Sequence, residues 1–353
     1  AQLAVGTMAG ASGLGVLQLF TSWTCIAGEI LGQGLPTRAM RQVSVAYAEQ
    51  QGEAIRQLLR EARRKVVRLW LLLLLSAAIP LALILPGKLP ADGTHSGWLL
   101  MGAVLAAPLF SLLRLYAEAL KATGSALAAV SLESLVSPMA LLLVCALCWL
   151  TGYPLLTIAL LGAFSLSLVV TPLALRVRLG QQLALLPPAP PGNLNSPLPA
   201  VPGELLSLWA IGVLSIGFLH LPFIVLPIYA DAAQIGVFAV AHKLIGVVTT
   251  MLLLLAAVFG PAFARLAAHS DAVGMMSLLR RTQLISTAVF LQVSLTLIAL
   301  ADPLARLFGE DFGDLQRFLV ILTAGSLVNA ATGLSGVMLN MAGAASKELT
   351  SLV

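Results

Sequence analysis

The sequence has little charge. Only 10% of its 353 residues are Asp, Glu, Lys or Arg and 59% are hydrophobic, whereas an ordinary soluble domain carries about 25% charged residues. A chain of this composition could not cover its own surface in water, which excludes a soluble globular protein. The sequence therefore predicts a polytopic membrane protein.

Cysteine is also scarce, and the motifs of soluble enzymes are absent. The three cysteines, Cys25, Cys145 and Cys148, lie in apolar stretches and are expected to be free thiols. The sequence contains no P-loop, GxSxG, HExxH or Rossmann fingerprint, and no loop is long enough for a catalytic domain. We therefore expect no enzymatic activity, no metal ion, no cofactor and no nucleic-acid partner.

Apolar segments of about 20 residues or more recur along the chain, and a helix needs about that length to cross the hydrocarbon core. Strict alternation of apolar and polar residues is absent, which argues against membrane-spanning strands. We expect an all-α fold of about ten helices. The predicted helices cover roughly 1–10, 16–47, 65–85, 98–123, 126–150, 155–178, 204–229, 232–267, 275–301 and 315–342.

Short matches between the two halves indicate an internal repeat. Gly15 matches Gly236, and Leu58-Leu-Arg60 matches Leu278-Leu-Arg280, at an offset of about 220 residues that is kept along the chain. The repeat predicts two pseudo-symmetric six-helix lobes in parallel orientation.

The repeat also divides the chain. The N-terminal lobe is predicted at 1–180, with its first helix incomplete, and the C-terminal lobe at 203–353, with helices 11 and 12 missing. The Pro-rich segment 181–202 is predicted to be an extended linker, with an SH3-type ligand as the alternative.

Basic residues are concentrated in alternate connections, which indicates the orientation in the membrane. The opposite connections are nearly uncharged or acidic. The pattern predicts that the N-terminus and the linker are cytoplasmic, and the same basic side chains are able to contact anionic lipid headgroups. The basic residues are Arg56, Arg60, Arg63, Arg64, Lys65, Arg68, Arg176, Arg178, Arg265, Arg280 and Arg281.

The predicted helix at 16–47 carries polar residues at helical spacing. Ser22, Glu29, Gln33 and Arg38 are expected to lie close to one face. Glu29 falls near the middle of the membrane, where a carboxylate either lines a cavity and takes up a proton or cation, or is a structural carboxylic acid bonded to a neighbouring helix. Pro36 either bends the helix or marks its arrival at the interface.

Two further groups of polar residues fall in apolar helices. Arg114 and Glu118 are spaced for an ion pair with Lys121 nearby, so this group is either part of a cavity or a self-satisfied cluster. Lys243 favours a phosphate or carboxylate partner in a cavity, with snorkelling to the interface as the alternative. His220 and His242 are either functional or packing residues.

Several motifs, in order, carry a resemblance to a known family. They are Gly34-Leu-Pro-Thr-Arg38, the Leu226-Pro-Ile-Tyr229 run followed by Gly236-Val-Phe-Ala-Val-Ala-His-Lys243, and Leu339-Asn-Met-Ala-Gly343. With the duplicated lobe, the chain resembles the polysaccharide flippase branch, for O-antigen or exopolysaccharide, of the multidrug/oligosaccharidyl-lipid/polysaccharide exporter superfamily.

The resemblance implies two lobes around a central cavity in a bacterial inner membrane. Its members move an undecaprenyl-diphosphate-linked oligosaccharide from the cytoplasmic to the periplasmic leaflet by alternating access, for lipopolysaccharide O-antigen or exopolysaccharide synthesis. Membrane lipids, a coupling proton or sodium ion and the glycan polymerase machinery are the other expected partners. Glu29 is the candidate ion-coupling residue, and the candidate substrate-binding residues are Lys243, Arg114, His220, His242, Arg38, Gln33, Asn329 and Asn340.

Other functions stay open. A multidrug or cation antiporter of the same superfamily would have an acidic cavity, whereas most buried charges here are basic apart from Glu29 and Glu118. A lipid II flippase usually has two extra helices. A membrane-embedded polymerase or ligase would carry a large periplasmic loop, and a scaffold for the glycan machinery would not need buried Lys and Arg.

Overall fold

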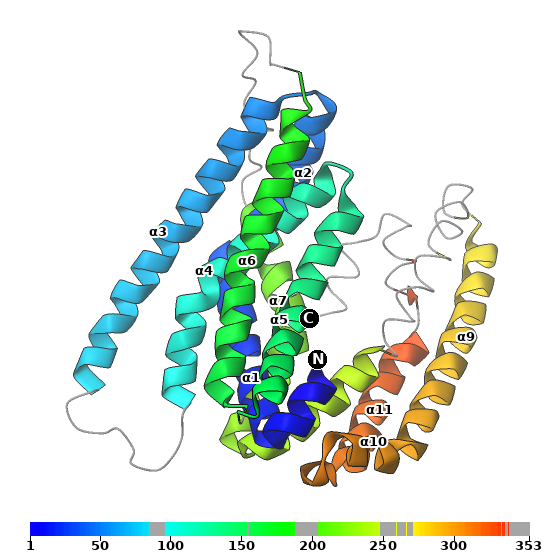
Figure 1. The fold of residues 1–353 in the computed structure, drawn as a ribbon. Helices are drawn as coiled ribbons and strands as arrows, with labels where there is room; N and C mark the ends of the chain where they lie inside the picture. The colour runs from blue at the N-terminus through cyan, green and yellow to red at the C-terminus, as the bar shows by residue number, and fades with distance from the viewer. Residues whose placement is uncertain are drawn as a thin grey trace. The chain divides into compact units, whose positions relative to one another are not determined.

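Every regular element that the structure describes is a helix (Figure 1). The computed structural model describes residues 1–84, 96–153, 155–187, 204–247, 259, 266, 271–332, 334, 335 and 338. In these ranges no strand is present, because the residues are dominated by Leu, Ala and Val without a period-2 pattern. The predicted all-α fold is therefore confirmed.

Six helices in the described ranges are long and apolar enough to cross a membrane. Several of them expose large apolar side chains: Leu127, Trp149 and Ile158 are 84%, 76% and 79% exposed. Such faces are stable in lipid and not in water, so the chain is a multi-pass membrane protein. The six spans are Gln2–Gly32, Leu99–Ala122, Ala126–Thr151, Thr157–Ala184, Ala272–Ala299 and Leu315–Thr332.

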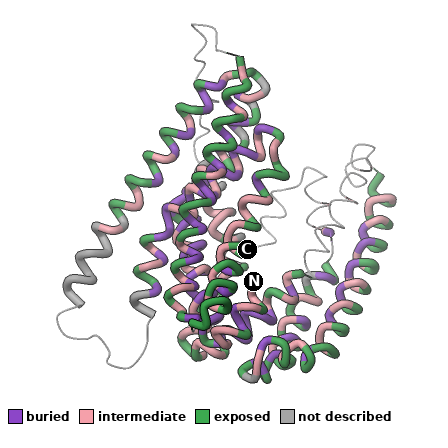
Figure 2. The backbone as a smooth tube through the Cα atoms, viewed as in Figure 1, coloured by how far each residue is buried: buried purple, intermediate pink, exposed green. Residues whose placement is uncertain are grey.

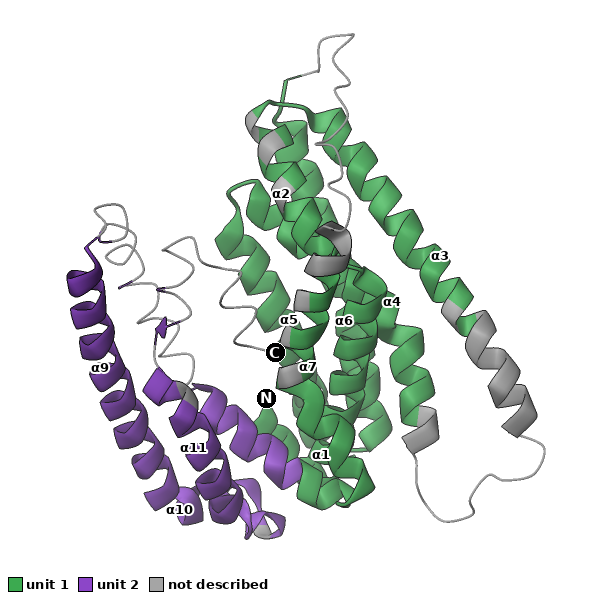
Figure 3. Ribbon diagram, turned by 180° about the vertical axis from the view of Figure 1, so that it is seen from behind, with its two compact units in different colours: residues 1–235 green, residues 236–353 purple. Residues whose placement is uncertain are grey.

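The chain forms two compact units, residues 1–235 and 236–353 (Figure 3). In both units buried and exposed residues alternate along the helices (Figure 2), so each helix has a packed face and an open face. The first unit contains α1 Gln2–Gly32, α2 Leu35–Ala48, α3 Gly52–Ile84, α4 Ser96–Ala122, α5 Ala126–Thr151, α6 Thr157–Ala184, α7 Glu204–Val225 and the 3₁₀ turn η1 Leu226–Ile228.

The centre of the first unit is α4, which packs against α1, α2, α5 and α6. Ala103, Ala107 and Ala117 of α4 are fully buried, and Gly28 of α1 meets this helix so closely that an added Cβ would lie 2.9 Å from the carbonyl oxygen of Ala107. Gly32 of α1 also faces α4. These two small residues, four apart on one face of α1, therefore allow α1 and α4 to pack closely.

The prediction of one continuous helix over 16–47 is wrong. Gln33 and Gly34 both have positive φ, 46° and 69°, and a residue in this left-handed conformation ends the helical hydrogen-bond series. The chain resumes at Leu35 as α2, and Pro36 lies in the first turn of α2, where its missing N–H costs nothing. The predicted boundary between the first two helices corresponds to Gly10, whose φ of 69° kinks α1.

The second unit contains the end of the Ala232–Val247 helix, α9, α10, the 3₁₀ turn η2 and α11. Phe290 of α9 and Ala330 of α11 are fully buried against each other, and the Ser286 hydroxyl donates to the Ala330 carbonyl at 3.0 Å. The connection between the predicted helices at 275–301 and 315–342 forms α10 and η2. The bounds are α9 Ala272–Ala299, α10 Ala301–Phe308, η2 Glu310–Phe312 and α11 Leu315–Thr332.

The predicted lobe boundaries stay a prediction. The helix α6 continues to Ala184, and residues 188–202 of the predicted Pro-rich linker lie outside the described residues. Within the first unit, α7 packs against α1. This contact decides where Glu29 and His220 lie.

Candidate functional site

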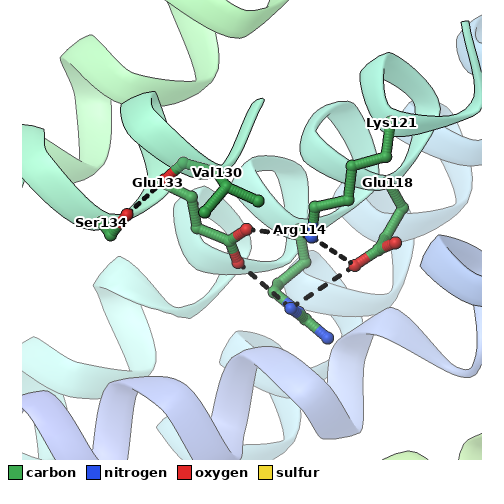
Figure 4. A network of polar contacts seen from close by, with 6 residues as sticks. All are labelled: Arg114, Glu118, Lys121, Val130, Glu133 and Ser134. Carbon is green, nitrogen blue, oxygen red and sulfur yellow. Dashed lines mark hydrogen bonds and ion pairs between the residues drawn. The ribbon is translucent and has the colours of Figure 1, made fainter. Parts of the chain in front are cut away.

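Four charged side chains form a closed group between α4 and α5, which we call the charged cluster: Arg114, Glu118, Lys121 and Glu133 (Figure 4). Arg114 Nη1 lies 3.1 Å from Glu133 Oε1 and 3.5 Å from Glu118 Oε1. Lys121 Nζ lies 3.1 Å from Glu118 Oε1 and 3.1 Å from Glu133 Oε2. Each carboxylate therefore contacts both cations.

Local sequence explains this geometry. Arg114, Glu118 and Lys121 follow at spacings of four and three residues, so they share one face of α4. Gly124, with a φ of 84°, closes the turn after α4, and Ser125 precedes α5. The turn returns the chain along α4 and brings Glu133 to the same face.

Glu133 was not foreseen as part of the site. It is the single charged residue in the apolar helix Ala126–Thr151, and an isolated charge in such a helix is a signal of a partner on a neighbouring helix. With Glu133 included, the cluster holds two cations and two carboxylates, with side chains 13% to 30% exposed.

The charge of Arg114 is thus balanced by its neighbours. The Nε atom of Arg114 is buried and has no hydrogen-bond partner in the described part of the chain, so the side chain keeps one donor unused. The spacing of Arg114, Glu118 and Lys121 predicted either part of a cavity or a self-satisfied cluster, and the observed geometry is that of the self-satisfied cluster. Substrate binding by Arg114 stays a prediction. A cation whose charge is already balanced attracts an anion only weakly.

Glu29 lies on α1 beside this cluster and is only 7% exposed. Its carboxylate occupies the space left by the missing side chain of Gly212 on α7: a Cβ at Gly212 would lie 2.4 Å from Glu29 Oε1. Arg114 and Glu118 are near enough to act on Glu29 electrostatically. The structure therefore brings Glu29 to the α1–α7 contact, within range of the charged cluster.

A second polar contact joins α1 and α7 further along. His220 Nδ1 lies 2.9 Å from the hydroxyl of Ser22, and the Gln18 amide donates to the same hydroxyl at 3.2 Å. Ser22 and Glu29 both face α7, so this part of the predicted polar face is confirmed. Trp209 Nε1 on α7 also donates to the Ile30 carbonyl at 3.2 Å. Because the later α7 residue His220 meets the earlier α1 residue Ser22, α1 and α7 run antiparallel.

The polar face does not continue to Gln33 and Arg38 as predicted, because the left-handed break at Gln33 changes the direction of the chain. Gln33 caps α1, and Arg38 lies half-buried on α2. Neither makes an ion pair or hydrogen bond with Glu29 or with the charged cluster among the residues that the structure describes. Their roles in substrate binding stay predictions.

The remaining candidates belong to the second unit. Lys243 is exposed on the Ala232–Val247 helix. The neighbouring His242 ring stacks on Phe238 with centroids 5.9 Å apart, and Phe238 in turn meets Phe318 of α11 edge to face at 5.8 Å. This arrangement gives His242 a packing role, whereas its predicted contact with substrate is untested. Asn329 lies on α11, and Asn340 is outside the described residues.

Comparison with protein-family models and with curated proteins finds no match. Two solved structures share the fold. One, described as the inward-facing conformation of a multidrug resistance MATE family transporter of the MOP superfamily, has a TM-score of 0.68 and 18% identity, covering 100% of this chain and 83% of that chain.

The other is a MOP superfamily transporter from Pyrococcus furiosus, with a TM-score of 0.57 and 15% identity, covering 99% of this chain and 84% of that chain. Its description states that the reverse polarity of its binding pocket suggests a different function. At these identities the likeness shows that this chain shares the fold of these two proteins, and nothing finer. The polysaccharide flippase branch stays a prediction.

Proposed function

We propose that the protein is a flippase that moves an undecaprenyl-diphosphate-linked oligosaccharide across a bacterial inner membrane by alternating access. The N-terminus and the linker are cytoplasmic in this proposal, and the product serves O-antigen or exopolysaccharide synthesis. The observation that carries it is Lys243, an exposed cation and the one Lys, Arg, Asp or Glu residue of the apolar helix Ala232–Val247, in a fold shared with transporters. A diphosphate needs such a cation, since moving its charge through a membrane without a partner is very costly.

Support for an ion-coupled mechanism comes from Glu29. A carboxylate that is 7% exposed in an apolar helix is costly to keep charged without a neutralising partner, and a coupling proton or sodium ion would supply one. The Glu29 side chain of α1 also packs against Gly212 of α7. A change in its charge therefore acts directly on how two helices pack, which is what coupling requires.

The test measures the distribution of undecaprenyl-diphosphate-linked glycan between the two leaflets of cells with and without the complete protein. We expect glycan to accumulate in the cytoplasmic leaflet when the protein is absent or carries Lys243→Ala, at unchanged protein level. Lys243→Arg, which keeps the charge, should restore export, and Lys65→Ala is the matched control. Normal export by Lys243→Ala would remove Lys243 from the mechanism, and trapped lipid II instead of glycan would identify a lipid II flippase.

A second candidate, a multidrug or cation antiporter of the same superfamily, is favoured by the charged cluster. Arg114 and Lys121 are already balanced by Glu118 and Glu133, and Glu29 adds a further carboxylate in the same unit. An excess of acid suits a cationic cargo. Cells lacking the protein would then accumulate cationic dyes while the glycan distribution stayed unchanged.

A further inference from the structure

A pocket lined by four arginines lies where the start of α3 meets the end of α6, and we call it the arginine pocket. It has a volume of about 370 Å³, within the range of roughly 300–1,000 Å³ that is typical of small-molecule sites. The start of α3 and the end of α6 lie together at one end of the first unit (Figure 1). The lining residues are Arg56, Leu59, Arg60, Arg63, Tyr116, Arg176, Leu179, Gly180 and Leu183.

The charges in the arginine pocket are only partly balanced. Glu53 pairs with Arg56 and lies 3.9 Å from Arg60. Arg63 and Arg176 have no ion-pair partner among the residues that the structure describes. The pocket therefore keeps a clear excess of positive charge, and two of its guanidinium groups are available for an anion.

The rest of the pocket is apolar. The lining residues Leu59, Tyr116, Leu179 and Leu183 are between 2% and 7% exposed, so the apolar wall of the pocket is packed into the protein. Guanidinium groups bind phosphate oxygens through paired hydrogen bonds and tolerate partial desolvation. A phosphate joined to an apolar group fits this combination better than a fully hydrated inorganic ion.

The outer surface of α6 extends the apolar part of the pocket. Leu173 and Val177 are 53% and 59% exposed, and their spacing of seven and three residues from Gly180 places all three on one helical face. Arg176 lies on the same side at this end of the membrane span. Acyl chains can follow this face into the membrane while the headgroup remains among the arginines.

We propose that the arginine pocket binds the phosphate headgroup of an anionic membrane lipid. The site goes beyond the proposed transport function, because its residues are separate from Glu29, Lys243 and the charged cluster. Its readout is lipid binding and not transport, so failure of either proposal leaves the other standing.

The experiment places the intact protein in phosphatidylcholine nanodiscs with a small fraction of phosphatidylglycerol and counts retained phosphatidylglycerol by native mass spectrometry. The double variant Arg63→Gln/Arg176→Gln should lower retention about tenfold, as expected for the loss of two charge-assisted contacts. The matched control is Arg64→Gln/Arg178→Gln, which removes two neighbouring charges that do not line the pocket.

A second variant fills the pocket without changing its charge. In the described part of the chain, a Cβ built at Gly180 meets nothing within 4 Å beyond its own helix backbone and chain neighbours, so the side chain of Gly180→Phe can enter the pocket and should also lower retention. Equal losses in the control variant, or unchanged retention in both pocket variants, would overturn the proposal. Displacement of the lipid by inorganic pyrophosphate at equal concentration would overturn the lipid as the source and assign the site to a soluble phosphate.

Discussion

Arg114 of α4 and Glu133 of α5 form an ion pair at 3.1 Å across two neighbouring apolar helices. The same two residues are linked a second time through Glu118 and Lys121, so the removal of one member leaves the others with unbalanced charge. An unbalanced charge in a membrane helix is costly even where the side chain is partly open to solvent. The ion pair therefore stabilises the packing of α4 against α5.

We predict that Glu133→Gln destabilises the protein by about 1–3 kcal/mol, because it leaves Arg114 and Lys121 with one carboxylate between them. Arg114→Gln/Glu133→Gln should cost less than the sum of the single changes. Thermal unfolding in detergent measures both quantities. Glu61→Gln on α3 is the control, since within the described ranges this exposed carboxylate accepts a single hydrogen bond, from Gln57 at 3.0 Å. If the loss in the double variant equalled the sum of the single losses, Arg114 and Glu133 would not stabilise the protein as a pair.

Gly28 gives a prediction about packing alone. A Cβ at this position would lie 2.7 Å from Phe110 Cδ1 and 2.9 Å from the backbone oxygen of Ala107, so α1 and α4 must separate to admit it. Gly28→Ala should destabilise by about 1–3 kcal/mol. Gly162→Ala, at a helical site where the added Cβ meets no other described residue's atoms within 4 Å beyond its own helix backbone and chain neighbours, should not destabilise the protein. Equal melting temperatures for the two variants would show that the helices separate without cost.

Composition and apolar length were sufficient to predict the helices, because a spanning segment must satisfy its own backbone hydrogen bonds. The break at Gln33 was not predictable in the same way: nothing in its side chain requires a φ of 46°. The partner of Arg114 was also missed. Spacing along one helix finds Glu118, whereas Glu133 is brought in by the turn at Gly124 and the packing of α5 on α4.

Glu29, the ion-coupling candidate, is a second case in which sequence spacing predicts neighbours within one helix but not the helix that packs against it. Sequence spacing predicted that Ser22 and Glu29 share a face, and the structure confirms it. The identity of the opposing helix depended on a contact between residues nearly two hundred positions apart, His220 and Ser22. Periodicity within one helix carries no information about such a contact.

Gly212 tests whether the position of the Glu29 carboxylate matters. Because the atom nearest to an added Cβ is the end of a flexible side chain, at 2.4 Å, Gly212→Ala should displace the carboxylate at little cost in stability. We expect transport to fall severalfold while the melting temperature stays within a few degrees. Gly217→Ala on the same helix is the control, because its Cβ would meet no atom of the described residues within 4 Å beyond its own helix backbone and chain neighbours. If both variants transport alike, the position of the carboxylate is unimportant.

Glu29→Gln tests the charge itself. The amide keeps the shape of the side chain but cannot release a proton or bind a sodium ion as a carboxylate does. In proteoliposomes with an imposed proton or sodium gradient, we expect the variant to transport at a rate that no longer depends on that gradient. Its melting temperature should equal or exceed that of the unmodified protein, since a carboxylate that is 7% exposed is costly to bury in its charged form. Glu118→Gln, which removes a carboxylate from the neighbouring cluster, should instead lower the melting temperature and keep the gradient dependence. Unchanged dependence in Glu29→Gln would assign Glu29 to packing between α1 and α7 and leave the coupling residue to be sought elsewhere.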